Sequence, residues 1–253
     1  VLVCGASQGI GFASAVELAK LGAECVLLAR NAEKLEEAKR ELDKLSAGAQ
    51  HKVIVCDLND RKQLRSSIEA EVKSRPIEIL IHNSGGPKGG PLLEASETEF
   101  LSGFENHILS AQLLAQVLVP GMKHQNYGRI INIVSTSVKA PIPGLGVSNT
   151  IRGAMGSFAK TLAGELGPFA ITVNNVLPGY TKTERLEALK KAAATKNSKS
   201  ESDIENLWKS ATPLGRFAEA HEVGAAVAFL ASPAAAFITG INLPVDGGRT
   251  PTL

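Results

Sequence analysis

The stretch Val1-Leu2-Val3-Cys4-Gly5-Ala6-Ser7-Gln8-Gly9-Ile10-Gly11 predicts a short buried strand that runs into a glycine turn and a helix. Gly5 permits the tight turn, Gly9 leaves room for a pyrophosphate beside the backbone, and Gly11 lets the helix lie close on the strand. The free N–H groups of the first helical turn then face the phosphates. We therefore expect a nucleotide to contact this turn, at Gly5, Ser7, Gln8, Gly9, Ile10 and Gly11.

The chain has 253 residues, of which 44% are hydrophobic, and this length suits one α/β domain spanning residues 1–253. No apolar run reaches the ~18 residues of a membrane span, so we expect a cytoplasmic protein without membrane contact. A net charge of +2 and an aromatic content of 4% argue against nucleic-acid binding.

The chain has an odd number of cysteines, Cys4, Cys25 and Cys56, and they show no C-x-x-C spacing. We therefore expect buried free thiols and no metal site. Val1 falls inside the first predicted strand, so residues upstream of it are expected.

Six further apolar runs predict buried strands, separated by stretches with helical periodicity. Continuous apolar strands that alternate with helices are typical of a parallel sheet covered on both faces. The fold class that we expect is therefore α/β, a Rossmann-type three-layer sandwich around a seven-stranded, mostly parallel sheet. The predicted strands after the first cover residues 25–28, 53–57, 77–81, 129–135, 171–177 and 240–245.

Short motifs accompany these strands along nearly the whole chain. They are Asp57, His82-Asn83-Ser84-Gly85, Asn132-Ile133-Val134-Ser135, Pro178-Gly179 and Asp246-Gly247-Gly248. Together with the glycine turn, this series resembles the short-chain dehydrogenase/reductase family, in which the turn usually opens with Thr-Gly and where Cys4 stands here in place of the threonine. The resemblance implies an oxidoreductase that binds NAD(P) at the carboxyl ends of its strands.

Arg30 follows the second strand, where an acidic residue would bind the ribose of NAD. No acid is present there, and a guanidinium can pair with the 2′-phosphate of NADP, so NADP is the expected cofactor and NAD the less favoured one. The alternative is that Arg30 is a solvated residue beside the helix capped by Asn31. The resemblance assigns the adenine amino group to Asp57, whose alternative role is to cap the next helix. It places further cofactor contacts at Leu58, Asn83, Gly85, Arg152, Pro178, Gly179, Thr181 and Thr183.

The fifth strand ends at Ser135, the position of the family's catalytic serine, which polarises the substrate carbonyl. Asn106 lies in a helix that the capping-box sequence Ser96-Glu97-Thr98-Glu99 starts and that we expect to end near Val119. The resemblance gives Asn106 the task of holding a water of the proton relay, and a surface position is the alternative. His82 stands where the family has an asparagine that buttresses the strand, and this structural role is favoured over a catalytic one.

Two positions of the family's catalytic site do not match. Counted from Ser135, the tyrosine position holds Ser148, and the lysine position four residues later holds Arg152. A serine hydroxyl is a far weaker acid than a phenol, whereas arginine keeps the positive charge but cannot release a proton. We expect Arg152 to hold the cofactor ribose and Ser148 to cap the helix that begins one residue later. The proton is then expected from water near Asn106 or from Tyr180.

The sequence Ser148-Asn149-Thr150-Ile151-Arg152, together with His82-Asn83-Ser84-Gly85-Gly86, is similar to a subgroup of 3-oxoacyl-[acyl-carrier-protein] reductase-like proteins with an incomplete catalytic tetrad. This resemblance implies NADP(H)-dependent reduction of a carbonyl in a small-molecule or acyl-carrier-bound substrate, such as a 3-oxoacyl group. The alternative is a dinucleotide-binding sensor or partner protein without turnover.

Two further segments carry expectations about the substrate and about assembly. Residues 184–211 are polar and resemble the family's mobile substrate lid. Apolar residues recur at helical spacing from Ile151 to Leu166, with Gly153 and Gly156 among them. In the resembling family such helices build a subunit interface, so we expect a homodimer or homotetramer. A glycine-assisted contact within the chain is the alternative.

Overall fold

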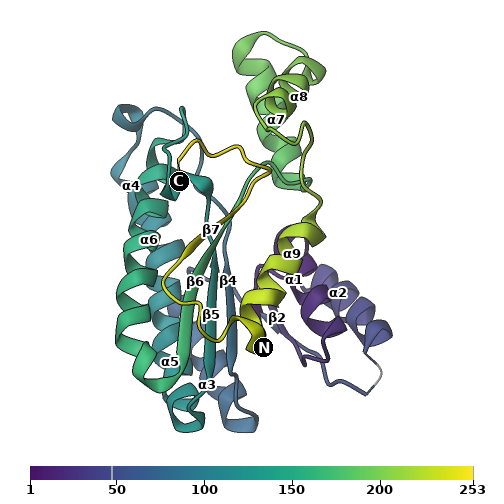
Figure 1. The fold of residues 1–253 in the computed structure, drawn as a ribbon, viewed down its shortest axis with the longest axis vertical. Helices are drawn as coiled ribbons and strands as arrows, with labels where there is room; N and C mark the ends of the chain where they lie inside the picture. The colour runs from purple at the N-terminus through teal and green to yellow at the C-terminus, as the bar shows by residue number, and fades with distance from the viewer. Residues whose placement is uncertain (47, 253) are drawn as a thin grey trace.

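Seven parallel strands form one sheet within residues 1–46 and 48–252, which are the residues that this computed structural model describes (Figure 1). The strand order is β3-β2-β1-β4-β5-β6-β7, and every neighbouring pair is parallel. The predicted α/β sandwich is confirmed, and its sheet is parallel throughout. The strands are β1 (Leu2–Cys4), β2 (Val26–Ala29), β3 (Lys52–Val55), β4 (Ile79–Asn83), β5 (Gly128–Ile133), β6 (Ile171–Pro178) and β7 (Asn242–Val245).

Helices cover both faces of this sheet (Figure 1). Alternate strand residues point to opposite faces, so Val3 packs in the core under α1, α2 and α9, whereas Leu2 and Cys4 pack in the core under α3, α5 and α6. The helices are α1 (Gly9–Lys20), α2 (Ala32–Leu45), α3 (Arg61–Ser74), α4 (Glu97–Phe104), α5 (Ser110–Gln125), α6 (Gly146–Leu166), α7 (Glu184–Asn197), α8 (Glu201–Ser210) and α9 (Ala220–Ala231).

The strand order reverses direction between β1 and β4, because the chain passes from β1 outward to β3 and then returns to pair β4 with β1. Open parallel sheets bind ligands at such a switch point, beyond the carboxyl ends of the strands. This topology places the glycine turn after β1 beside the loop after β4.

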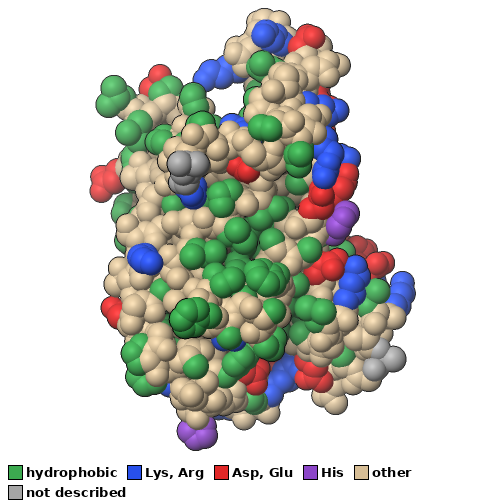
Figure 2. All heavy atoms as spheres, viewed as in Figure 1, with side chains coloured by type: hydrophobic (Ala, Val, Ile, Leu, Met, Phe, Trp, Pro, Cys, Tyr) green, Lys and Arg blue, Asp and Glu red, His purple; other side chains and the backbone are tan. Residues whose placement is uncertain are grey.

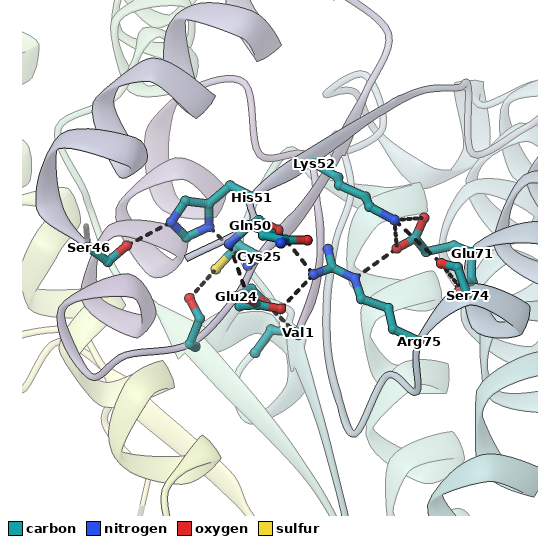
Figure 3. A network of polar contacts seen from close by, with 11 residues as sticks. Val1, Glu24, Cys25, Ser46, Gln50, His51, Lys52, Glu71, Ser74 and Arg75 are labelled. Carbon is teal, nitrogen blue, oxygen red and sulfur yellow. Dashed lines mark hydrogen bonds and ion pairs between the residues drawn. The ribbon is translucent and has the colours of Figure 1, made fainter. Parts of the chain in front are cut away.

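A polar network ties together the opposite, amino end of the strands (Figure 3). Arg75, which follows α3, donates to Glu71 at 2.8 Å, to Glu24 at 2.8 Å and to the carbonyl of Gln50 at 3.0 Å. His51 accepts a hydrogen bond from the backbone N–H of Cys25 at 3.1 Å. These contacts hold the starts of β2 and β3 against the end of α3 and leave the carboxyl ends of the strands for the site.

The three cysteines are free and buried, as the sequence predicted. Burial raises the pKa of Cys4 to about 12, so its thiol stays protonated. No helix among the described residues has the length and apolar character needed to cross a membrane.

The segment expected as a lid folds into α7 and α8, which project beyond the carboxyl ends of the strands (Figure 1). Hydrophobic side chains gather on the visible face in the region of β7 and α9 (Figure 2). Phe229 in α9 and Phe237 farther along the chain are both exposed. Exposed apolar patches of this kind are typical of protein–protein contacts.

Candidate active site at the carboxyl ends of the strands

The glycine turn after β1 has the geometry that the sequence predicted. Gly5 and Gly9 both have φ of +60°, a conformation that a side chain would strain. A Cβ added to Gly11 would lie 2.2 Å from the carbonyl oxygen of Gly5, so only glycine lets α1 approach the strand this closely. The side chain of Gln8, the residue before α1, makes no capping hydrogen bond, and the first turn of α1 carries no acid. The N-terminus of α1 therefore fits an anionic diphosphate.

Asn83 lies directly behind this turn. A Cβ added to Gly5 would lie 2.6 Å from Asn83 Nδ2, and that Nδ2 donates weakly to the carbonyl of Gly5 at 3.5 Å. Asn83 at the end of β4 thus buttresses the glycine turn. Its predicted contact with the cofactor stays a prediction.

The start of α7 closes over the other side of the turn. A Cβ added to Gly9 would lie 3.3 Å from Thr183 Cγ2. Glu184 accepts a hydrogen bond from Gln8 Nε2 at 2.8 Å and pairs with Lys34 Nζ at 3.2 Å. Lys34 also donates to Gln8 Oε1 at 2.6 Å. Lys34 and Glu184 are members of the site that the sequence reasoning did not identify, because neither belongs to a motif.

Arg30 extends from the end of β2 into solvent, with a side chain that is 79% exposed. Its Nη1 atom lies 3.8 Å from Asp57 Oδ2, so the two predicted cofactor residues are neighbours. Asp57 does not cap α3, since Asp60 does so by accepting from the N–H of Gln63 at 3.0 Å. Leu58, the next residue after Asp57, is buried. The alternative role of Asp57 as a cap is therefore wrong, and its carboxylate lies beside the cation expected to hold the 2′-phosphate.

Pro178 is the last residue of β6, and the loop after it runs from Gly179 to Thr183 along the same edge of the sheet. Gly179 is required where the backbone passes Asp246, because an added Cβ would lie 2.6 Å from the Asp246 Cα. Thr181 is buried and donates to the carbonyl of Gly179 at 3.2 Å. Thr183 caps α7 by accepting from the N–H of Leu186. Of the two threonines, Thr183 is the one that lies against the glycine turn.

Arg152 bonds the backbone at the carboxyl end of β5, directly before Ser135. The Nη1 atom of Arg152 donates to the carbonyls of Ile133 at 3.0 Å and Val134 at 2.9 Å, directly before Ser135. Ser135 is half-buried, and its hydroxyl accepts from the N–H of Ser137 at 3.2 Å. Burial, with the nearby charge of Arg185, lowers the pKa of Arg152 to about 10, which leaves the guanidinium charged at neutral pH.

Ser148 does not cap a helix, and this prediction is wrong. Helix α6 begins at Gly146, so Ser148 lies inside its first turn, and the residue before the helix is Leu145. The N–H of Gly146 donates instead to the carbonyl of Gly90 at 3.0 Å. A partner from the loop between β4 and α4 thus starts the helix three residues earlier than a serine cap would.

Asn106 lies in a π-helical segment, Glu105–Leu109, that joins α4 to α5. The helix predicted from Ser96 therefore continues to Gln125, past Val119, with one widened turn in its course. Asn106 is half-buried, and its Nδ2 atom donates to the carbonyl of Gly85 at 3.0 Å. Widened turns of this kind are frequent at functional sites.

Two buried histidines lie beside this segment. His82 Nε2 lies 2.9 Å from Ser110 Oγ, and His107 Nδ1 lies 2.5 Å from Ser84 Oγ. Burial, with the nearby charge of Arg152, lowers the pKa of His82 to about 3 and that of His107 to about 2, so both imidazoles are neutral. His82 is thus buried in a structural contact, as favoured from the sequence. His107 was not identified there.

Tyr180 lies under the α7–α8 segment. Its ring stacks on Trp208 with centroids 4.8 Å apart, and Arg249 donates to its hydroxyl at 3.2 Å. Burial raises the pKa of Tyr180, although Arg249 opposes the change, so the phenol keeps its proton at neutral pH.

The apolar stripe of α6 packs within the chain. Ile151, Met155 and Leu166 are buried there, and a Cβ added to Gly156 would lie 2.9 Å from Val138. The alternative of an intramolecular contact is therefore the one observed for these residues, and a subunit interface through α6 stays a prediction.

Comparison with known proteins agrees with this geometry. The family described as enoyl-(acyl carrier protein) reductase matches residues 5–250. Gluconate 5-dehydrogenase of Gluconobacter oxydans (strain 621H) is 32% identical over 253 residues, which cover 100% of this chain and 94% of that protein. The 3-oxoacyl-[acyl-carrier-protein] reductase FabG of Pseudomonas aeruginosa is 32% identical over 251 residues, 98% of this chain and 95% of that one.

Among solved structures, L-sorbose reductase from Gluconobacter frateurii, complexed with NADPH and L-sorbose, superposes with a TM-score of 0.93 at 30% identity. That alignment covers 100% of this chain and 96% of the reductase chain. The family match, the relatives and the shared fold extend over the same residues that build the site. The chain belongs to the short-chain dehydrogenase/reductase family of oxidoreductases.

Proposed function

We propose that this protein is an NADP(H)-dependent reductase of carbonyl substrates. The observation that carries the proposal is the glycine turn, which leaves the N-terminus of α1 without a capping side chain or an acid. The exposed guanidinium of Arg30 supports NADP over NAD, because a charged hydrogen bond to the 2′-phosphate is open to it. The solved L-sorbose reductase with NADPH supports the same cofactor.

The residues beyond the ends of β1, β2, β3, β4 and β6 would hold the cofactor, whose nicotinamide supplies the hydride when bound. Backbone N–H groups from Gly9 to Gly11 would bind the diphosphate, with Thr183 beside them. Asp57 would accept from the adenine amino group next to Arg30. The backbones around Gly85 and Gly179 complete the set carried over from the family.

Ser135 would donate its hydroxyl proton in a hydrogen bond to the substrate carbonyl oxygen, which polarises the carbonyl carbon. Arg152 would orient the ribose and stabilise the oxygen as negative charge develops on it. The proton that completes the alcohol would come from water held near Asn106 or from the neutral phenol of Tyr180. Ser148, inside the first turn of α6, is assigned no step.

The substrate class is a ketone or 3-oxoacyl compound, as a small molecule or bound to an acyl carrier. The relatives named as gluconate 5-dehydrogenase and 3-oxoacyl-[acyl-carrier-protein] reductase support this range. The second candidate is a dinucleotide-binding sensor or partner protein without turnover. The serine and arginine at the tyrosine and lysine positions favour it, because losing a positioned general acid costs about 10²- to 10⁴-fold in rate.

The deciding experiment titrates the purified protein with NADPH and with NADH, then measures NADPH oxidation with a panel of ketones, sugars and 3-oxoacyl thioesters. Tight NADPH binding with turnover supports the reductase. Tight binding with no turnover on any of these substrates supports the sensor. Absence of dinucleotide binding contradicts both.

A further inference from the structure

Two guanidinium groups meet beside Gly86, in the loop between β4 and α4. A Cβ added to Gly86 would lie 3.5 Å from Arg152 Nη2 and 3.6 Å from Arg185 Nη2. Arg152 belongs to α6, whereas Arg185 lies in the first turn of α7. The charge of Arg185 acts on Arg152, because it adds to burial in lowering the pKa of Arg152. Two cations thus face one small region of the site.

No carboxylate of the described residues forms an ion pair with either arginine. Arg152 is 7% exposed, its Nη1 atom is held by two backbone carbonyls, and its Nε atom is buried without a partner. Arg185 donates to the carbonyl of Pro87 at 3.0 Å. A buried cation without a counterion is costly, so an anion at this point would be stabilised by both side chains.

Arg152 also reaches the strand end that carries Ser135, the serine of the proposed function. Arg152 bonds the carbonyl of Val134, and the following residue is Ser135, which we assigned to the substrate oxygen. Resting on that function, we propose that the substrate is a short oxo acid whose carboxylate is bound between Arg152 and Arg185. Planar guanidinium groups suit this role because they present paired donors to a carboxylate.

Neighbouring residues of α7 separate this anion from the cofactor diphosphate. Glu184 turns toward the glycine turn, where it contacts Gln8 and Lys34. Arg185 turns the other way and contacts Pro87. The diphosphate belongs on the side of Gly9 and Thr183, so the anion between the two arginines comes from the substrate.

The test compares oxo acids with their methyl esters, which keep the carbonyl and lose the charge. The probes are 4-oxopentanoate and 2-oxobutanoate, each with its methyl ester, and the readout is kcat/KM with NADPH. The parent protein should prefer each acid to its ester. Arg185→Gln should lower this acid-to-ester ratio by about 10- to 100-fold, mainly through KM, because it removes a charged hydrogen bond to the bound acid. Arg185→Lys should restore part of the ratio.

Lys191→Gln is the matched control, since it removes an exposed cation six residues beyond Arg185, on a different side of the same helix. The acid-to-ester ratio should stay at the parent value in this variant. A binding readout independent of turnover is calorimetry of 4-oxopentanoate with the protein saturated by NADP⁺. Arg185→Gln should raise that Kd by a similar factor.

Three outcomes would overturn the inference. Equal kcat/KM for acids and esters in the parent would show that the carboxylate is not recognised, while leaving a carbonyl reductase in place. An Arg185→Gln variant that loses NADPH affinity and keeps the acid preference would place Arg185 on the cofactor diphosphate. Failure of the parent to bind NADPH would remove the proposed function and this inference together.

Discussion

Replacing Arg152 by methionine separates its role in the site from its role in the fold. Methionine keeps the length of the side chain and removes the charge and the donors. Arg152 makes two hydrogen bonds to the end of β5, at 3.0 Å and 2.9 Å. It is also the residue that we propose to contact the cofactor ribose and the substrate, so the substitution should affect both stability and binding.

The two effects differ in size. Hydrogen bonds from a charged group contribute about 1.5–3 kcal/mol each, so the two bonds to β5 stabilise the fold by about 3–6 kcal/mol. Burial opposes this, because lowering the pKa from 12.5 to about 10 costs about 3 kcal/mol. Arg152→Met should therefore reduce the free energy of unfolding by at most about 3 kcal/mol. Losing the bond to the ribose should weaken NADPH binding by about 1.5–3 kcal/mol, which is about 10- to 150-fold in Kd.

The assay measures urea unfolding by circular dichroism and NADPH affinity by calorimetry on the same preparation. Arg129→Met is the matched control. Arg129 is also a buried arginine on β5, and its Nη1 atom donates to the carbonyls of Gly128 and Ala170 at the opposite end of the strand. The control should lose stability and keep the parent affinity for NADPH.

The reasoning fails if Arg152→Met lowers stability by more than about 4 kcal/mol while its NADPH affinity stays within threefold of the parent. Arg152 would then be a brace for β5 with no contact to the cofactor. Equal losses of NADPH affinity in Arg152→Met and Arg129→Met would point to a general loosening of the sheet.

Four further predictions concern single sites and assembly. Arg30→Asp should reverse a preference for NADPH over NADH measured by calorimetry, and equal affinities in the parent would remove the argument from Arg30. Ser148→Ala should change turnover by less than tenfold and the free energy of unfolding by less than about 0.5 kcal/mol, because Ser148 does not cap a helix. Loss of turnover with unchanged NADPH affinity would make Ser148 the proton donor. The stability that neutral His82 provides is complete above pH 6.5 and is lost as pH falls toward its folded pKa of about 3, since the unfolded chain takes up the proton first. The free energy of unfolding, measured with urea, should therefore fall between pH 6.5 and pH 5 by about 2 kcal/mol less in His82→Asn than in the parent. An equal fall in both proteins would contradict the burial argument. Sedimentation should show a dimer or larger assembly, with exposed Phe229 and Phe237 as its apolar surface, and a monomer at all concentrations would reject it.

Local rules were sufficient for the sheet and for the glycine turn. Continuous apolar runs at β1 and β2 have no polar face to show to solvent, so they predict a parallel sheet covered on both sides. Local backbone geometry requires both Gly5 and Gly11: Gly5 has a φ of +60°, and a Cβ added to Gly11 would lie 2.2 Å from the carbonyl oxygen of Gly5. Asn31 likewise caps α2 through the N–H of Lys34, three residues away.

The start of α6 could not be predicted in this way, because its first N–H finds a partner far away in the sequence. Ser148 satisfies the preference for a serine before a helix, yet Gly90 supplies the carbonyl that lets the helix begin at Gly146. The same limit hid Lys34 and Glu184, which become members of the site only because α7 folds back onto the glycine turn. Such contacts depend on tertiary approach and leave no local pattern.

The most consequential of these tertiary effects is the placement of Arg152, which stands where the family has its lysine. Sequence spacing places Arg152 four residues after Ser148 on one helical face, which suggests a charge directed at the cofactor. In the structure one end of the guanidinium, Nη1, is committed to the end of β5, and the other end, Nη2, faces Gly86 together with Arg185. A lysine presents its three donors from one nitrogen, whereas a guanidinium spreads five donors over three nitrogens in a fixed plane, so Nη1 and Nη2 can bind partners in two different places. The exchange of lysine for arginine therefore adds an anion-binding surface to the site, and it does so only because Arg185 arrives from α7 to share it.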